Sequence, residues 1–112
     1  MHELSITWNI FELVAEAAKG RKVNRIIVEI GELSGVTADS VAFWFPEVAR
    51  GTEVAEASLE IRKISALARC EACSAEFPTT SMLTACPCGS FRLKRLRGEE
   101  LIIKSIELEE VP

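Results

Sequence analysis

The chain has 112 residues, of which 48% are hydrophobic and 27% are charged, and its formal net charge is −4. This composition is ordinary for a soluble globular domain, and no stretch approaches the roughly 20 apolar residues of a membrane span. Because no basic segment followed by an apolar one marks a secretory signal, we expect a cytoplasmic protein. The negative charge argues against general binding to nucleic acid.

The first predicted element is a helix over residues 3–18. Its apolar residues recur at helical spacing, and one stripe is formed by Leu4, Trp8, Phe11 and Ala15. Gly20 is suited to end this helix, because glycine readily takes the left-handed conformation found just beyond a helix C-terminus.

A β-strand is predicted at residues 25–33, because β-branched residues alternate there. A second helix follows, with Thr37 or Asp39 as its N-cap. Pro46 should kink or split this helix, because proline lacks a backbone donor and clashes with the preceding turn. The bulky apolar residues of the two helices are expected mainly in the core, although some could form a patch for a partner: Trp8, Phe43, Trp44, Phe45 and Val48.

Two further strands are predicted at residues 58–64 and 100–110, with a cysteine-rich segment between them. This order of elements predicts an α+β fold in which two helices pack on a small β-sheet. The cysteine-rich segment, residues 67–98, should form a lobe inserted into a body made of residues 1–66 and 99–112.

The lobe differs from the body in charge. It holds five basic and two acidic residues, a net charge of +3, whereas the body holds eight basic and 15 acidic residues. A lobe with a basic strand could bind nucleic acid. However, its four cysteines, bound as thiolates to one divalent metal ion, would add a charge of −2, which leaves the lobe near +1 and favours an acidic partner protein. The basic residues behind the last cysteine are Arg92, Lys94, Arg95 and Arg97.

All four cysteines lie in this lobe. Cys70 and Cys73 form a C-x2-C pair, and Cys86 and Cys88 form a C-x-C pair, with twelve residues between the two pairs. Two close thiol pairs at this separation are typical of a structural zinc site with four thiolates in a tetrahedron. In an extended backbone, residues i and i+2 face the same side, so the shorter pair could reach the same ion. A redox-active pair is the competing interpretation, but no helix N-terminus is predicted nearby to lower a thiol pKa.

The only histidine is His2, directly behind Met1. It could be an inert, solvated residue at a loose terminus. It could also form a chelate with the α-amine of Met1 and the backbone nitrogens of His2 and Glu3, and such nitrogen donors suit Ni(II) or Cu(II). From chemistry alone, both interpretations remain open.

Four stretches together resemble the HypA/HybF family, whose members insert nickel during [NiFe]-hydrogenase maturation. They are MHE at the start, GELSGV at residues 31–36, the FWF helix that leads to Gly51 and Thr52, and C-x2-C followed by CPCGS. The resemblance covers essentially the whole chain, although the family's usual second pair is C-P-x-C-G and one residue is missing here. It implies a mixed sheet covered by two helices, with a zinc-ribbon-like lobe inserted before the last strand.

The resemblance also implies the metals, the ligands and the partners. Ni(II) would be bound transiently at His2, with Met1 and Glu3 contributing, and Asp39 is a further candidate ligand. The partners would be a HypB-type GTPase and the hydrogenase large-subunit precursor, with urease maturation proteins as additional candidates. A structural Zn(II) would be held by Cys70, Cys73, Cys86 and Cys88.

We therefore interpret the chain as a nickel metallochaperone and not as an enzyme. It contains no phosphate-binding G-x-x-x-x-G-K-[ST] motif, and its one histidine has no nucleophile at a defining spacing. One alternative is a zinc-ribbon adaptor that binds a protein or nucleic-acid partner without nickel. Another is a redox sensor in which Cys70 and Cys73 form a disulfide.

Overall fold

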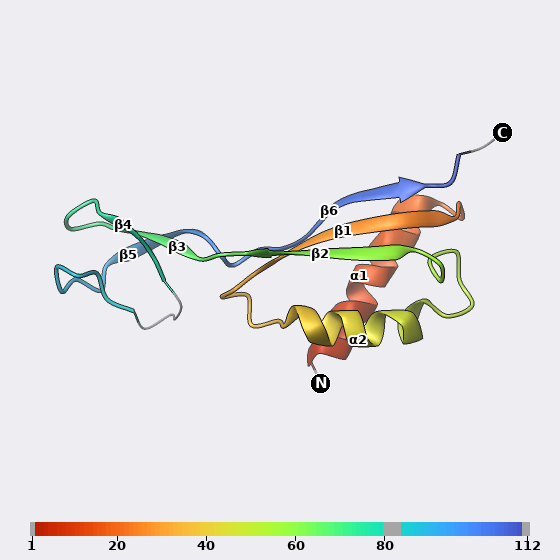
Figure 1. The fold of residues 1–112 in the computed structure, drawn as a ribbon, viewed down its shortest axis with the longest axis horizontal. Helices are drawn as coiled ribbons and strands as arrows, with labels where there is room; N and C mark the ends of the chain where they lie inside the picture. Colours follow the sequence, from red (N-terminus) through yellow and green to blue (C-terminus); the bar gives the residue numbers. More distant parts are fainter. Residues whose placement is uncertain (1, 80–83, 111–112) are drawn as a thin grey trace.

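The computed structural model describes residues 2–79 and 84–110. The molecule is elongated, with a radius of gyration of 17.4 Å, whereas a compact chain of this length would have roughly 13 Å. Two helices and one sheet lie at one end, and a second sheet lies at the other (Figure 1). In chain order the elements are α1 (His2–Ala18), β1 (Val23–Gly31), α2 (Ala38–Ala49), β2 (Ser58–Ile64), β3 (Leu67–Cys70), β4 (Glu76–Pro78), β5 (Leu93–Arg97) and β6 (Leu101–Leu108).

The first sheet has the strand order β2-β1-β6, with β1 parallel to β2 and antiparallel to β6. It is therefore the mixed sheet that the family resemblance implies. Strand β1 is central, and its aliphatic residues are buried, including Ile27 on the side away from the core cluster.

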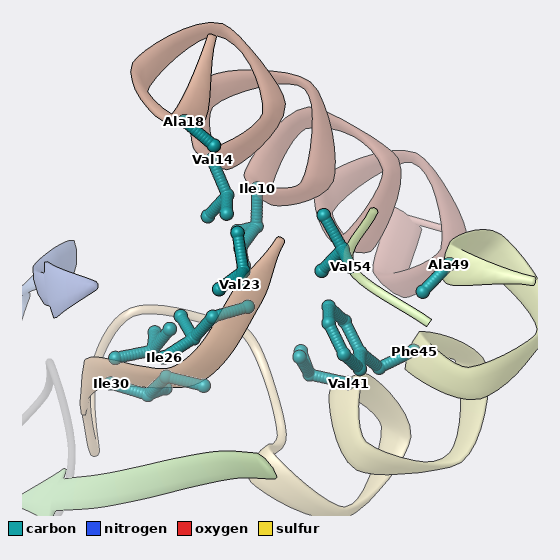
Figure 2. Close-up of a cluster of buried hydrophobic side chains, with 11 residues drawn as sticks. Ile10, Val14, Ala18, Val23, Ile26, Ile30, Val41, Phe45, Ala49 and Val54 are labelled. Atoms are coloured by element: carbon teal, nitrogen blue, oxygen red, sulfur yellow. The ribbon is translucent and has the colours of Figure 1, made fainter. Parts of the chain in front are cut away.

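Helices α1 and α2 cover one face of this sheet (Figure 1). Side chains from both helices and from β1 point toward one another and form the core (Figure 2). Neither helix has the length and apolar character needed to cross a membrane, within the described part of the chain. The core side chains drawn in Figure 2 include Ile10, Val14, Val23, Ile26, Val41, Phe45 and Val54.

The buried face of α1 is not the stripe that the sequence favoured. Leu4 and Trp8 are 37% and 48% exposed, whereas Thr7, Ile10 and Val14 are buried. Both stripes are apolar at helical spacing, so periodicity alone could not choose between them. The stripe that faces the sheet is rich in β-branched side chains. In the other stripe, Leu4 and Trp8 are at the surface, whereas Phe11 is partly buried against the core.

Thr37 precedes α2, and its side chain accepts a 3.4 Å hydrogen bond from the backbone N–H of Ser40. This confirms Thr37 as the N-cap. The helix is one continuous segment that contains Pro46, so the expected split does not occur. Pro46 lies in the last turns, where only a few backbone bonds follow it, and the buried side chains of Phe45 and Val48 hold those turns against the core.

The second sheet has the order β4-β3-β5, with both pairs antiparallel. Strand β3 follows β2 almost directly, and β5 is followed closely by β6, so the inserted segment leaves and rejoins the first sheet side by side (Figure 1). The lobe therefore has a sheet of its own in addition to its cysteine loops.

The GELSGV motif lies where the two sheets meet. The backbone N–H of Leu33 donates a 2.6 Å hydrogen bond to the carbonyl of Gly98, and that of Gly31 donates a 2.8 Å bond to the carbonyl of Glu100. A Cβ atom on Gly31 would overlap the backbone of Gly98. This close approach explains why the motif begins with glycine.

Candidate metal centre

The structure brings the four cysteines together. One sulfur from each residue lies within 4.8 Å of all the others, and the separations are 3.7 Å for Cys70–Cys88 and 3.5 Å for Cys73–Cys86. A tetrahedral zinc ion with Zn–S bonds of about 2.3 Å requires sulfur atoms about 3.8 Å apart. The donor set and its spacing therefore fit a four-thiolate zinc ion.

The first cysteine loop, residues 70–75, begins at the end of β3. The backbone N–H of Cys70 donates a 2.8 Å hydrogen bond to the carbonyl of Ala75, and that of Ser74 donates a 2.9 Å bond back to the carbonyl of Cys70. Ser74 has a φ of 65°, in the left-handed region. The chain thus reverses within six residues and turns the sulfurs of Cys70 and Cys73 toward the same point.

The second loop, residues 86–90, repeats this arrangement in one residue fewer. The N–H of Cys86 donates a 2.9 Å bond to the carbonyl of Ser90, and that of Gly89 donates a 2.8 Å bond to the carbonyl of Cys86. Gly89 has a φ of 94°, so it takes the place of Ser74. The segment is a tight turn with Pro87 in its second position, and the extended backbone expected from the C-x-C spacing was wrong.

The comparison of the loops explains how the missing residue is tolerated. The closing bond spans four residues in the first loop, from Ser74 to Cys70, and three in the second, from Gly89 to Cys86. In addition, the N–H of Cys88 points to the sulfur of Cys86 at 3.5 Å. The shorter turn therefore still presents two sulfurs on one side.

Burial and hydrogen bonding divide the four thiols. Cys70 and Cys86 are buried, and Cys73 and Cys88 are exposed. The backbone N–H of Cys73 lowers the pKa of the Cys70 thiol to about 6. The N–H of Cys88 lowers the pKa of Cys86, but burial and the neighbouring sulfurs raise it to about 12. Four negative charges cannot collect here without a cation, and a divalent ion would remove this conflict.

The described residues of the lobe form almost no apolar core of their own. Phe91 is 74% exposed, and the buried residues are small ones. A lobe with so little buried apolar surface needs an additional source of stability, such as a structural metal ion. Among the described residues of 67–98, the buried ones are Ala68, Cys70, Thr79, Cys86 and Gly98.

The proposed nickel ligands are placed only in part. Met1 lies outside the described residues, and so do the side chains of His2 and Glu3, whose backbone forms the start of α1. Asp39 lies in the first turn of α2 and is exposed. The first turns of α1 line a groove together with later residues of α2. Glu47, and not Asp39, is the acidic residue in the lining of this groove. Sequence spacing gave no sign of this pairing, because it depends on how the helices cross.

Comparisons with known proteins agree with this fold. A family model described as "Hydrogenase/urease nickel incorporation, metallochaperone, hypA" matches residues 1–108. The Hydrogenase maturation factor HypA of Nostoc sp. (strain PCC 7120) is 50% identical over 111 residues, which cover 99% of this chain and 98% of that protein. The corresponding factor of Geotalea uraniireducens is 44% identical, covering 97% of this chain and all of its own length.

A solved structure is also similar. The solution structure of the Ni metallochaperone HypA from Helicobacter pylori superposes with a TM-score of 0.67 at 26% identity, covering 95% of this chain and 96% of that one. It contributes the same fold, and the sequence relatives extend over nearly the whole chain. The chain therefore belongs to the HypA family of hydrogenase and urease nickel-incorporation metallochaperones.

Proposed function

We propose that this protein binds Ni(II) at its amino terminus and delivers it during [NiFe]-hydrogenase maturation, while Zn(II) on the four cysteines has a structural role. The observation that carries this proposal is the closed sulfur cluster, in which all four ligand atoms lie within 4.8 Å of one another. A complete tetrahedron has no open position. A transported ion then needs another site, and His2 is the only imidazole of the chain.

The start of α1 supports a nitrogen-ligand site. The first backbone N–H groups of a helix have no acceptor within the helix. The amide nitrogens of His2 and Glu3 could therefore bind a metal without the loss of helical hydrogen bonds. Together with the amine of Met1 and the His2 imidazole, they form the planar nitrogen set that Ni(II) favours. The carboxylate of Glu3, or less directly that of Asp39, would complete a higher coordination number.

The proposed role of zinc follows from the small residues buried in the lobe. Zinc would fix the two cysteine loops, and the body would keep its separate core of helix and β1 side chains. A strong chelator should then remove hydrogen-exchange protection from residues 67–97 and leave that of β1 unchanged. Loss of protection in both parts would show that zinc supports the whole fold.

Further steps of the proposal concern partners and location. A HypB-type GTPase would act with this protein, and the hydrogenase large-subunit precursor would receive the nickel, with urease maturation proteins as further recipients. The lobe would dock the recipient through its basic strand β5. Four reduced thiols used for metal binding suit the cytoplasm, where disulfides are rare.

Calorimetric titration of untagged protein with Ni(II) tests the carrier function. The His2→Ala variant should lose nickel binding and keep its zinc content and its thermal stability, because the four cysteines and the core side chains drawn in Figure 2 are unchanged. The Asp39→Asn variant is a control that should keep most of the affinity. Native affinity in His2→Ala would place the nickel site elsewhere, and absence of nickel binding in the wild type would favour the zinc-ribbon adaptor.

A further inference from the structure

A groove between α1 and α2 presents large apolar side chains that the core does not use. It has a volume of about 540 Å³. Trp8 of α1 is 48% exposed, and Phe43, whose ring packs against that of Trp44 in the lining, is 71% exposed. Large aromatic residues at the surface are characteristic of the centres of protein interfaces. The groove is lined by Leu4, Ser5, Trp8, Asn9, Trp44, Glu47 and Val48.

The two helices that form this groove are strongly acidic. Together α1 and α2 contain five acidic residues and no lysine or arginine. Glu47 lies in the groove lining itself, and Arg50, which follows the end of α2, forms an ion pair with it at 2.8 Å. Glu12, Glu16 and Asp39 are exposed on the same helices outside this lining, so an occupant of the groove meets an apolar floor and the net negative charge of the two helices. The acidic residues are Glu3, Glu12, Glu16, Asp39 and Glu47.

We propose that this groove binds a basic amphipathic helix of a partner protein. A third helix laid between two helices buries apolar side chains at positions i, i+3 and i+4. Its apolar face would cover Trp8 and Trp44, and lysine or arginine side chains beside that face would meet the carboxylates. Fully covered tryptophans would be the main anchors of the complex.

The charge pattern disfavours other occupants of the groove. A second copy of this chain would bring the same acidic helices, so like charges would face each other. Phosphate groups, whether of nucleic acid or of anionic lipid, would be repelled in the same way. A basic peptide segment is the class of ligand that satisfies both the apolar floor and the charge.

This proposal deepens the carrier function, on which it rests for its biological meaning. Leu4 and Ser5 of the groove lie within the first turns of α1, directly behind the proposed nickel ligands. A helix bound there would lie beside the amino terminus, where nickel would be received or released. The binding itself needs no nickel, so the two proposals can be tested separately.

Both tryptophans of the chain line this groove, so their fluorescence reports its occupancy. The probe is a synthetic Leu/Lys amphipathic helix of about 15 residues, a length at which isolated helices become marginally stable. A Leu/Glu helix of the same pattern is the matched control. Titration of zinc-loaded protein without added nickel should shift the tryptophan emission to shorter wavelength with the Leu/Lys probe and leave it unchanged with the Leu/Glu probe.

Variants assign the binding to this groove. Trp8→Ala should weaken the Leu/Lys probe by at least about tenfold in calorimetry, and Glu47→Lys should weaken it through charge alone. Leu13→Ala is the matched control, because Leu13 lies on the same helix, is 58% exposed and lines a different groove beside β6. His2→Ala should leave probe binding intact even where it abolishes nickel binding. Equal binding of the two probes, or equal effects of Trp8→Ala and Leu13→Ala, would overturn the proposal.

Discussion

The backbone N–H of Ala66 donates a 3.1 Å hydrogen bond to the carboxylate of Glu32, which belongs to a different turn 34 residues earlier. Ala66 is buried between β2 and β3, and Glu32 follows β1. The backbone N–H of Glu32 in turn donates a 2.9 Å bond to the carbonyl of Ile64. Through Glu32, the motif GELSGV is therefore hydrogen-bonded to the segment where the lobe begins.

Replacement of Glu32 tests how much the hydrogen bond to Ala66 contributes to stability. Glu32→Ala should lower the free energy of unfolding by about 1–2 kcal/mol, because a buried N–H loses its acceptor. Glu32→Gln keeps an acceptor oxygen at the same position and should recover most of the loss. Urea unfolding followed by tryptophan fluorescence measures both variants. Equal stability of Glu32→Ala and wild type would show that water replaces the carboxylate without cost.

Gly98 should be more sensitive than other glycines with a similar backbone. A Cβ atom there would lie 2.6 Å from the Cα of Ala66, and its φ is 114°. Gly98→Ala should therefore destabilise the protein by about 2–4 kcal/mol, through steric overlap added to backbone strain.

Gly35→Ala is the matched control for this prediction. Gly35 has a φ of 83°, but an added Cβ would meet no atom within 4 Å. It should cost only about 1 kcal/mol, from the left-handed backbone alone. Thermal unfolding of the two variants separates the contributions, and equal losses would mean that the lobe junction yields to the added methyl group.

Much of the fold could be predicted because the relevant signals are local. The β-branched run of β1, the N-cap at Thr37 and the cysteine spacing each act over a few residues, and the structure agrees with them. The inserted position of the lobe follows from the order of elements alone.

The remaining features depend on contacts between distant residues. Two apolar stripes of α1 were equally periodic, and only packing against β1 decides that Val14 is buried and Trp8 exposed. The compact turn at Cys86 depends on the bond from Gly89, which the C-x-C spacing does not reveal. The groove that joins Leu4 to Trp44 depends on the crossing of two helices. In each case the sequence shows which residues are present, but not which residues they contact in the folded protein.

The ion pairs that Glu60 forms on the first sheet predict that the stability of the protein depends on pH. The Arg25 guanidinium, which hydrogen-bonds to Glu60, lowers the pKa of that carboxyl, and Arg62 acts in the same direction. A carboxyl whose pKa is lowered by folding stabilises the protein above its unfolded pKa of about 4.3. That contribution is lost as the pH falls through the folded value.

Glu60→Gln should therefore reduce the fall in melting temperature between neutral pH and the acid range. Glu12→Gln removes one charge from the exposed face of α1 and serves as the control for net charge. Melting temperatures measured as a function of pH give the comparison. If Glu60→Gln and Glu12→Gln changed the profile equally, the pair with Arg25 would contribute nothing beyond general charge.

The equivalence of the two cysteine loops leads to a prediction about chain length. Insertion of one residue between Pro87 and Cys88 would give the second loop the six residues and C-x2-C spacing of the first. Zinc should remain bound, with an affinity within about tenfold of wild type, a difference of about 1.4 kcal/mol, because a known turn of this lobe fits the longer loop. Competition with a chromophoric chelator measures that affinity. Cys88→Ser keeps the original length and removes one sulfur, so it should lose zinc far more readily. An insertion variant that lost zinc as readily as Cys88→Ser would show that the tight bond from Gly89 to Cys86 is required to position the fourth sulfur.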